Sequence, residues 1–258
     1  MALYDQIGGN YDATRRADPE IARRLIEYLS PEPAGLYLDV ACGTGNYTAA
    51  LASAGLRLCG VDQSARMIAG ARPKRARVRW LVADVARLPF SDGLFSGAIC
   101  TLAIHHFREL GSPFGEVSRV MGRGRFVLFT AAPEQMRGYW LNEYFPAALE
   151  KSIEQMPSPE RVEEALAAAG FESVRSAQYE VAEELRDLFL YSGKQRPEMY
   201  LDPRVRAGIS TFAVLADPSE VRAGCEQLAR DIRSGRIADV IKAYAHDRGD
   251  YLFVIAEK

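Results

Sequence analysis

The strongest constraint on the fold is an alternation of short apolar runs with helical stretches, which begins near Leu36. Short apolar runs separated by segments of crossover length are typical of βα units that build a parallel sheet. The pattern therefore predicts an α/β fold with a mostly parallel sheet of seven strands and helices on both faces. The expected strands are 36–41, 56–61, 79–82, 97–101, 125–130, 172–181 and 251–256.

Amphipathic spacing predicts helices around and between these strands. Ile21, Leu25 and Leu29 recur at helical spacing, and Pro19 precedes them, so residues 19–30 are expected to form a helix that packs on the sheet. A second helix is expected to begin at Ser158-Pro159 and to end near Gly170.

Roughly 70 residues separate the last two expected strands, and a gap of this length needs its own structure. Within it, Asp217-Pro218-Ser219-Glu220 combines a cap, a first-turn proline and a capping-box acid. Two apolar stripes follow. We expect a single domain over 1–258, with 182–248 as a helical insertion or cover over the edge of the sheet. The stripes contain Val221, Cys225, Leu228 and Ile232, then Ile237, Val240, Ile241 and Tyr244.

Composition excludes several classes of protein. A formal charge of -2 over 258 residues does not favour a protein whose main task is to grip a polyanion. No apolar run approaches the roughly 20 residues of a membrane span, and the start lacks the plan of a signal peptide, so a cytoplasmic protein is expected. The four cysteines have no CxxC spacing, so no zinc or dithiol site is predicted. One basic cluster is expected to be a solvated surface segment: Arg72, Lys74, Arg75, Arg77 and Arg79.

The segment 36–47 runs from an apolar strand through a glycine-containing turn into a helix. Gly43 and Gly45 allow a tight turn and a close approach of the backbone to a ligand, because no side chain stands in the way. The helix that follows presents free amide groups and its positive end to whatever occupies the turn. This turn is the first candidate for a ligand site.

Three acids stand at the ends of the first three expected strands. Asp39 lies in the first strand, Asp62 follows it by 23 residues, and Asp84 comes just after the third. Asp62 can accept hydrogen bonds from both hydroxyls of a ribose, and Asp84 from an adenine amino group. Because open α/β sheets bind ligands at the carboxyl ends of their strands, the three carboxylates are expected to line one crevice.

Together these motifs resemble the class I S-adenosylmethionine (SAM)-dependent methyltransferases, especially the small-molecule group that includes the ubiquinone and menaquinone methyltransferases. The resemblance covers about 4–130 and the final strand. It implies a Rossmann-like sheet with the last strand antiparallel, SAM as cofactor and S-adenosylhomocysteine as product. It assigns the turn 39–45, with Asp39, Ala41, Gly43 and Gly45, to the methionine part of SAM. The family usually has glycine where Ala41 stands, so a slightly tighter turn is expected.

The same resemblance places the other cofactor contacts. It assigns Asp62 to the ribose, Asp84 with Val85 to the adenine, and Thr101 to the side of the methionine. Further residues are expected around this core: Gln63 and Met67 beside the adenine, and Tyr11 and Arg16 on an N-terminal lid.

Other functions remain open from the sequence. A nicotinamide-dependent oxidoreductase also uses a glycine turn and a second-strand acid, but it predicts G-x-G-x-x-G, whereas Asn46, Tyr47 and Thr48 follow Gly45 here. A SAM-binding enzyme with non-methylating chemistry would have the same cofactor site. A non-catalytic binding protein should have a degraded glycine turn.

Methyl transfer needs in-line positioning, and a general base only if the acceptor arrives protonated. His105 and His106 follow the fourth strand and are the candidates for that base, whereas His246 is expected to be structural. No Asn-Pro-Pro-Tyr turn or Pro-Cys pair is present, so a small-molecule acceptor is expected and nucleic acid is not. The sequence leaves oligomeric state open. Two aromatic groups suit either an acceptor cover or a plain core: Tyr139, Trp140, Tyr144 and Phe145, and the run 188–191.

Overall fold

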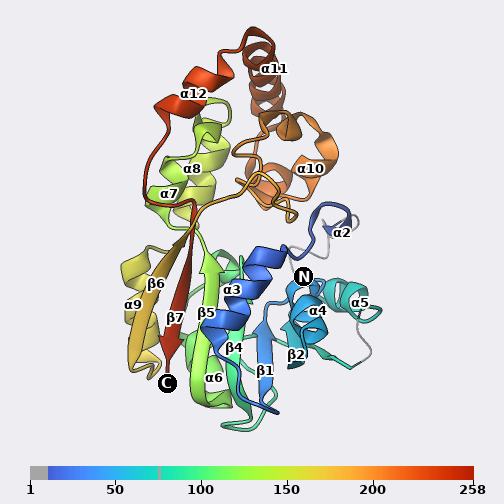
Figure 1. Cartoon of the computed structure of the whole chain (residues 1–258), viewed down its shortest axis with the longest axis vertical. Helices are drawn as coiled ribbons and strands as arrows, with labels where there is room; N and C mark the ends of the chain where they lie inside the picture. The colour runs from blue at the N-terminus through green and yellow to red at the C-terminus, as the bar shows by residue number, and fades with distance from the viewer. Residues whose placement is uncertain (1–10, 75–76) are drawn as a thin grey trace.

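The computed structural model describes residues 11–74 and 77–258, and it shows the expected α/β architecture (Figure 1). All seven predicted strands are confirmed, and their ends shift by at most a few residues. The sheet order is β3-β2-β1-β4-β5-β7-β6. The strands are β1 Leu36–Val40, β2 Arg57–Asp62, β3 Arg79–Val82, β4 Phe95–Thr101, β5 Met121–Thr130, β6 Ser173–Tyr179 and β7 Tyr251–Glu257.

Strand direction decides where the polar ends of the strands meet. β1 pairs in parallel with both β2 and β4, and the parallel ladder continues outward to β3 and β5. β7 is antiparallel to its neighbours β5 and β6, which confirms the expected direction of the last strand. The carboxyl ends of β1, β2, β3 and β4 therefore lie along one edge of the sheet.

The helices follow the predicted order, with several short turns in addition. α3 and α9 were expected at 19–30 and from 158 to near 170, and both are confirmed within two residues. The α-helices are α2 Tyr11–Thr14, α3 Pro19–Leu29, α4 Asn46–Ser53, α5 Ala65–Ala71, α6 Gly111–Val120, α7 Pro133–Arg137, α8 Pro146–Glu154, α9 Pro159–Ala168, α10 Pro203–Ala207, α11 Pro218–Ser234 and α12 Ile237–Ala243. Shorter turns are η2 Ile104–His106, η3 Trp140–Glu143, η4 Pro197–Leu201 and η5 Thr211–Leu215.

Period-two alternation in the strands divides the apolar side chains between two cores. In β5, Val127 and Phe129 join the core that contains α3 and α4, whereas Phe126 and Leu128 join the core that contains α6 and α9. Helices therefore cover both faces of the sheet, as the sequence predicts. α3 packs against β4 and β5, which confirms that this helix lies on the sheet.

The segment between β6 and β7 lies beyond the carboxyl ends of the strands, with α7 and α8 beside it (Figure 1). α11 contacts η4, η5 contacts α8, and α12 contacts η3. The insertion, expected over the edge of the sheet, thus lies beyond the edge formed by the carboxyl ends of the strands. The apolar stripes of α11 and α12 are buried mainly against the aromatic segment 139–145 and the rest of the cover, because that segment offers the nearest apolar surface.

The first aromatic group forms the core of this cover. Tyr139, Trp140 and Phe145 are fully buried, and Tyr139 stacks on Tyr191 with ring centroids 3.9 Å apart. Trp140 meets Tyr200 edge to face. Of the two interpretations left open, the structure favours a plain core for these side chains. The division into one domain over 1–258, with 182–248 as a cover, stays a prediction. Within 11–74 and 77–258, no helix has both the length and the apolar content needed to span a bilayer.

Asp18 connects the sheet-bound helix α3 to the cover. One carboxylate oxygen caps α3 by accepting from the backbone N–H groups of Glu20 at 2.9 Å and Ile21 at 3.2 Å. The other accepts from the backbone N–H of Arg186 at 3.0 Å. Asp18 is 5% exposed, so both carboxylate oxygens are shielded from bulk water.

We expect Asp18→Ala to lower the free energy of unfolding by about 1–3 kcal/mol, because it removes a cap and leaves a buried N–H without its acceptor. Urea denaturation followed by circular dichroism measures the change. Asp217→Ala is the matched control, since Asp217 caps α11 from an exposed position through Ser219 N. Equal losses in the two variants would show that the Arg186 contact contributes nothing.

Candidate active site

A cavity of about 930 Å³ opens at the carboxyl edge of the sheet. It is lined by residues that follow β1, β2, β3 and β4, so the topology gathers the predicted site at one place. Three predicted residues with described side chains do not line it, namely Gly45, Arg16 and His105, and the side chain of Tyr11 lies outside the described residues. The predicted residues that do line it are Asp39, Ala41, Gly43, Asp62, Gln63, Met67, Asp84, Val85, Thr101 and His106.

The carboxylate of Asp62 ties the glycine turn to the loop after β2. Its two oxygens accept from the backbone N–H groups of Gly43 at 2.9 Å and Ser64 at 2.8 Å. The same carboxylate lines the cavity. The Asp62 carboxylate, which could bind a ligand's hydroxyls, therefore also stabilises the conformation of the turn.

The glycine turn has left-handed backbone at three positions. Ala41, Gly43 and Gly45 have φ values of 53°, 56° and 72°. A Cβ on Gly45 would stand 2.2 Å from the Trp80 ring, whereas a Cβ on Gly43 would meet no atom within 4 Å and would point into open space. Gly45 is thus needed for packing and Gly43 keeps room at the cavity. Ala41 adopts the turn at some steric cost, which agrees with an alanine in a glycine position.

Asp39 is almost completely buried at the floor of the cavity. Its carboxylate accepts a 2.5 Å hydrogen bond from the hydroxyl of Thr48, in the first turn of α4. Burial raises the pKa of Asp39 to about 7, while the Thr48 bond acts in the opposite direction and the nearby Asp62 adds to the rise. The group therefore changes charge near neutral pH.

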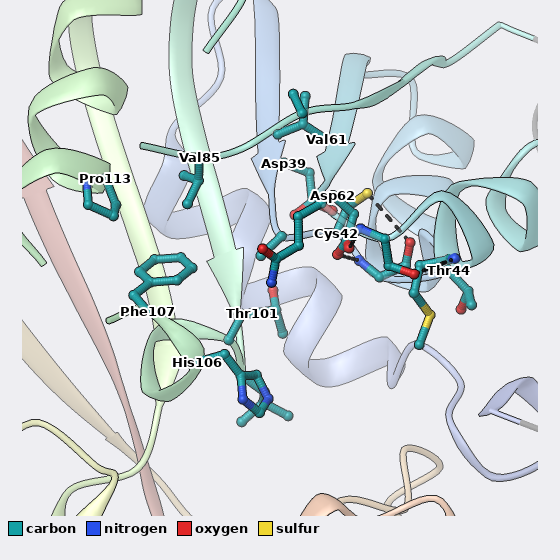
Figure 2. Close-up of a pocket in the computed structure, with 18 of the residues that line it drawn as sticks. Asp39, Cys42, Thr44, Val61, Asp62, Val85, Thr101, His106, Phe107 and Pro113 are labelled. Carbon is teal, nitrogen blue, oxygen red and sulfur yellow. Dashed lines mark hydrogen bonds between the residues drawn. The ribbon is translucent and has the colours of Figure 1, made fainter. Parts of the chain in front are cut away.

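The remaining lining residues form the opposite side of the cavity. Asp84 accepts from the backbone N–H of Ala86 at 3.0 Å, which fixes the loop after β3. In Figure 2, Asp39 and Asp62 lie on the same side as Cys42 and Thr44 of the turn, whereas Val85, Phe107 and Pro113 lie on the other side, and Thr101 lies between them. One wall is polar and one is largely apolar, as a nucleoside requires.

Two features at the end of β4 point to ligand contact. The hydroxyl oxygen of Thr101 is buried and has no hydrogen-bond partner among residues 11–74 and 77–258. Leu102, the next residue, has a φ of 53°, a conformation that costs a leucine about 1–2 kcal/mol. Backbone strain of this kind concentrates at functional sites.

The two adjacent histidines face different cavities. His106 lines the large cavity, near Thr101 (Figure 2), whereas His105 lines a second, smaller one. Their rings are tilted by 48° with centroids 3.9 Å apart. Burial lowers the pKa of His106 to about 4 and that of His105 well below its usual value, so both imidazoles are neutral at pH 7.

Sequence reasoning missed an ion pair on the cavity wall. Arg15 binds Asp187 through two hydrogen bonds, with Nε 2.6 Å from one oxygen and a terminal nitrogen 3.2 Å from the other. The Tyr47 hydroxyl donates to the same carboxylate at 3.1 Å, and both charged residues line the cavity. The prediction chose Arg16, which is exposed. Only the partner Asp187 distinguishes the two arginines, and it lies 172 residues away.

A second polar cluster holds the N-terminal segment against the glycine turn. Asp12 accepts from the Thr44 hydroxyl at 2.5 Å, from the Asn46 amide at 3.2 Å and from the Lys74 ammonium at 2.8 Å. Asn46 also donates to the backbone oxygen of Arg15. Lys74, expected on a solvated surface, instead joins this cluster, while Arg75 lies outside the described residues.

Comparisons with known proteins agree with this geometry. Residues 38–129 match a methyltransferase domain family. Demethylmenaquinone methyltransferase from Thermus thermophilus is 31% identical over 204 residues, which cover 67% of this chain and 92% of the relative. The chain belongs to the class I SAM-dependent methyltransferases. This result confirms the prediction that the protein is a methyltransferase enzyme that uses SAM.

Other relatives support the same family over different lengths. A solved structure described as a methyltransferase from an antibiotic biosynthesis pathway of Anabaena variabilis superimposes with a TM-score of 0.83 at 31% identity, covering 94% of this chain and 98% of that one. Malonyl-[acyl-carrier protein] O-methyltransferase from Serratia marcescens is 26% identical over 129 residues, and this match spans 50% of this chain and 51% of the relative.

Two structural observations agree with SAM as the ligand of this methyltransferase. The space over Gly43 would be filled by a Cβ, and the Thr101 hydroxyl is buried without a described partner. Both are accounted for when a ligand with polar hydrogens lies against the turn and the end of β4.

The two turn glycines should respond differently to alanine. We expect Gly43→Ala to lower the free energy of unfolding by only about 1–2 kcal/mol, because it adds left-handed strain without a clash, yet to weaken SAM binding at least tenfold. Gly45→Ala should lose more stability, because its Cβ also meets Trp80. Thermal unfolding and calorimetric SAM titration measure the two effects. Unchanged SAM affinity in a folded Gly43→Ala protein would contradict the assignment.

Asp39 should make stability fall with rising pH. Its ordinary pKa is 3.8 and its native value is about 7, so between these values the native state holds a proton that the unfolded chain has released. The resulting stability is fully present below about pH 4 and is lost as pH rises through 7. Between pH 5 and 8 the wild type should lose about 2–3 kcal/mol more than Asp39→Asn. Urea midpoints at the two pH values test this, and parallel curves would refute it.

Proposed function

We propose that this methyltransferase passes the methyl group of SAM to a small organic acceptor that enters the large cavity beside His106. The observation that carries the proposal is that the three strand-end acids, the glycine turn and one histidine line the same cavity. SAM supplies a methyl group made electrophilic by a positively charged sulfur. The protein contributes by holding the acceptor and the methyl group in line, which can supply roughly 7–11 kcal/mol.

The cofactor residues keep the roles that the resemblance implies. Asp62 would bind the ribose hydroxyls, Asp84 with Val85 the adenine, and Thr101 with the turn 39–45 the methionine part. Support comes from the position of Asp62 on the cavity wall and from the buried Thr101 hydroxyl, which has no hydrogen-bond partner within the described chain. Further contacts are proposed for Gln63 and Met67, which line the cavity, and for Tyr11 and Arg16.

Asp12 argues against a dinucleotide in the same site. Dinucleotide-binding sheets place a pyrophosphate at the N-terminus of the helix after the glycine turn. Here the carboxylate of Asp12 is hydrogen bonded to Thr44 and Asn46, at the start of α4. A pyrophosphate there would have to displace from Thr44 and Asn46 this carboxylate, whose charge Lys74 already pairs. SAM carries no diphosphate, so the described geometry favours it over a nicotinamide cofactor.

In the proposed reaction a lone pair of the acceptor forms the new bond to carbon while the carbon–sulfur bond breaks. Its electron pair stays on sulfur, and S-adenosylhomocysteine leaves uncharged at that atom. If the acceptor is a hydroxyl, its proton must depart, and His106 is the neutral group positioned to accept it. A conjugate acid with pKa about 4 gives up that proton readily to water, so His106 suits a relay better than a proton store.

The named substrates of the relatives do not fix the acceptor. One relative is named for demethylmenaquinone and another for a malonyl group on a carrier protein. Their alignments with this chain extend over 204 and 129 residues, and the methyltransferase family match of this chain spans 38–129. The acceptor of this chain is therefore argued from its own cavities.

Calorimetry with SAM, S-adenosylhomocysteine and NADH tests the cofactor proposal directly. We expect both sulfur compounds to bind the wild type and NADH not to bind, and we expect Asp62→Asn to weaken SAM binding by tenfold or more, because it removes a charge-assisted bond. Asp92→Asn is the matched control, since Asp92 is exposed and pairs with Arg119 away from the cavity. NADH binding without SAM binding would overturn the proposal.

A further inference from the structure

A second cavity of about 60 Å³ adjoins the large one and has a different character. Arg15 and Leu102 line both cavities, so the two meet at the strained residue after β4. Its volume exceeds the roughly 10–15 Å³ that one water needs, and it is far too small for SAM. It suits a short end of a molecule whose remainder lies in the large cavity.

The walls of this second cavity come from the cover as well as from the sheet. Met136, Met156, Phe189 and Leu190 give it apolar sides, while His105 stands at the sheet side. The run 188–191, which suited either an acceptor cover or a plain core, thus supplies two cavity residues. Methionine side chains adapt to irregular shapes, which suits a pocket that receives part of an organic ligand.

The polar groups of the cavity are mostly satisfied within the protein. Ser152 and Thr211 hydrogen bond to each other at 3.0 Å, and the Thr130 hydroxyl donates to a backbone oxygen. The Tyr251 hydroxyl accepts from Tyr191 N at 3.2 Å. These groups have little need of a ligand.

His105 differs from these satisfied groups. Its Nδ1 is buried and has no hydrogen-bond partner among the residues that the structure describes. A buried polar atom without a partner is costly, and His105 lines the second cavity, so a ligand group that reached Nδ1 would remove this cost. Burial lowers the pKa of His105, and the neighbouring His106 and Arg15 act in the same direction, so the ring is neutral and can accept a hydrogen bond.

The charge balance of the cavity restricts the ligand further. Arg15 is the charged group on its wall, and Asp187 neutralises it through two hydrogen bonds. An anionic ligand would have to compete with that carboxylate, and a cation would meet the guanidinium. An uncharged group that donates a hydrogen bond fits both the neutral imidazole and the balanced pair.

We propose that the second cavity is an acceptor subsite in which His105 recognises a hydroxyl group on an otherwise apolar, uncharged acceptor. The proposal rests on the proposed function, because it assumes that the acceptor occupies the large cavity beside the cofactor. His106 and His105 then have separate tasks: the first faces the reacting end of the acceptor, and the second selects its distal hydroxyl. His105 is thus a specificity-determining residue.

Phenol, toluene and benzoate are suitable probes, titrated into the protein saturated with S-adenosylhomocysteine and carrying ¹⁵N-labelled histidine. We expect phenol to shift the His105 Nδ1 resonance and to bind about three- to tenfold more tightly than toluene, the ratio that one hydrogen bond supplies. Benzoate should bind more weakly than phenol. The His105→Phe protein should bind phenol and toluene equally, whereas His105→Asn, which keeps an acceptor near the same place, should restore part of the preference.

The Leu190→Phe variant tests whether the probes bind in the second cavity. Its larger side chain fills that cavity and leaves the His105 imidazole in place. It should weaken phenol and toluene alike, with S-adenosylhomocysteine affinity unchanged. Equal binding of phenol and toluene to the wild type, or a phenol-induced shift at His106 alone, would overturn the subsite. Failure of S-adenosylhomocysteine to bind would instead overturn the proposed function, so the two failures are distinguishable.

Discussion

The site depends on one carboxylate that serves two loops at once. Asp62 ends β2 and accepts backbone hydrogen bonds from Gly43, in the turn after β1, and from Ser64, at the start of α5. Parallel pairing of β1 with β2 brings these loops together, and the carboxylate then fixes their relative position. Charge-assisted bonds to backbone N–H groups are among the stronger hydrogen bonds in proteins. The cavity is shaped by this bond network before any ligand arrives.

Much of this arrangement could be predicted from local sequence. The strands are short and apolar, and their carboxyl ends carry Asp39, Asp62 and Asp84, so a parallel sheet had to gather the three acids along one edge. The antiparallel direction of β7 came from the family resemblance, and the pairing confirms it. Capping side chains and prolines determine where α3, α9 and α11 begin. These effects involve only residues that are close in the sequence, so the sequence predicts them.

The remainder depends on contacts between distant residues. Arg15 and Arg16 are indistinguishable in the sequence, and only Asp187 in the folded cover selects the first. His105 and His106 are adjacent, yet η2 turns them towards different cavities. Tyr139, Trp140 and Phe145 look like ligand-binding aromatics until the cover encloses them. The cover lies beyond the strand ends because an apolar face was free there. No local pattern in the sequence predicts which face that is.

The edge position of β6 determines the order in which the chain can be completed. β6 pairs only with β7 within the described sheet, and β7 is formed by residues near the C-terminal end, Tyr251–Glu257. During synthesis β6 therefore has no strand to pair with until Tyr251–Glu257 has also emerged from the ribosome. A nascent chain can form the glycine turn once residue 64 is available, whereas the wall that Arg15 and Asp187 share needs more than a hundred further residues.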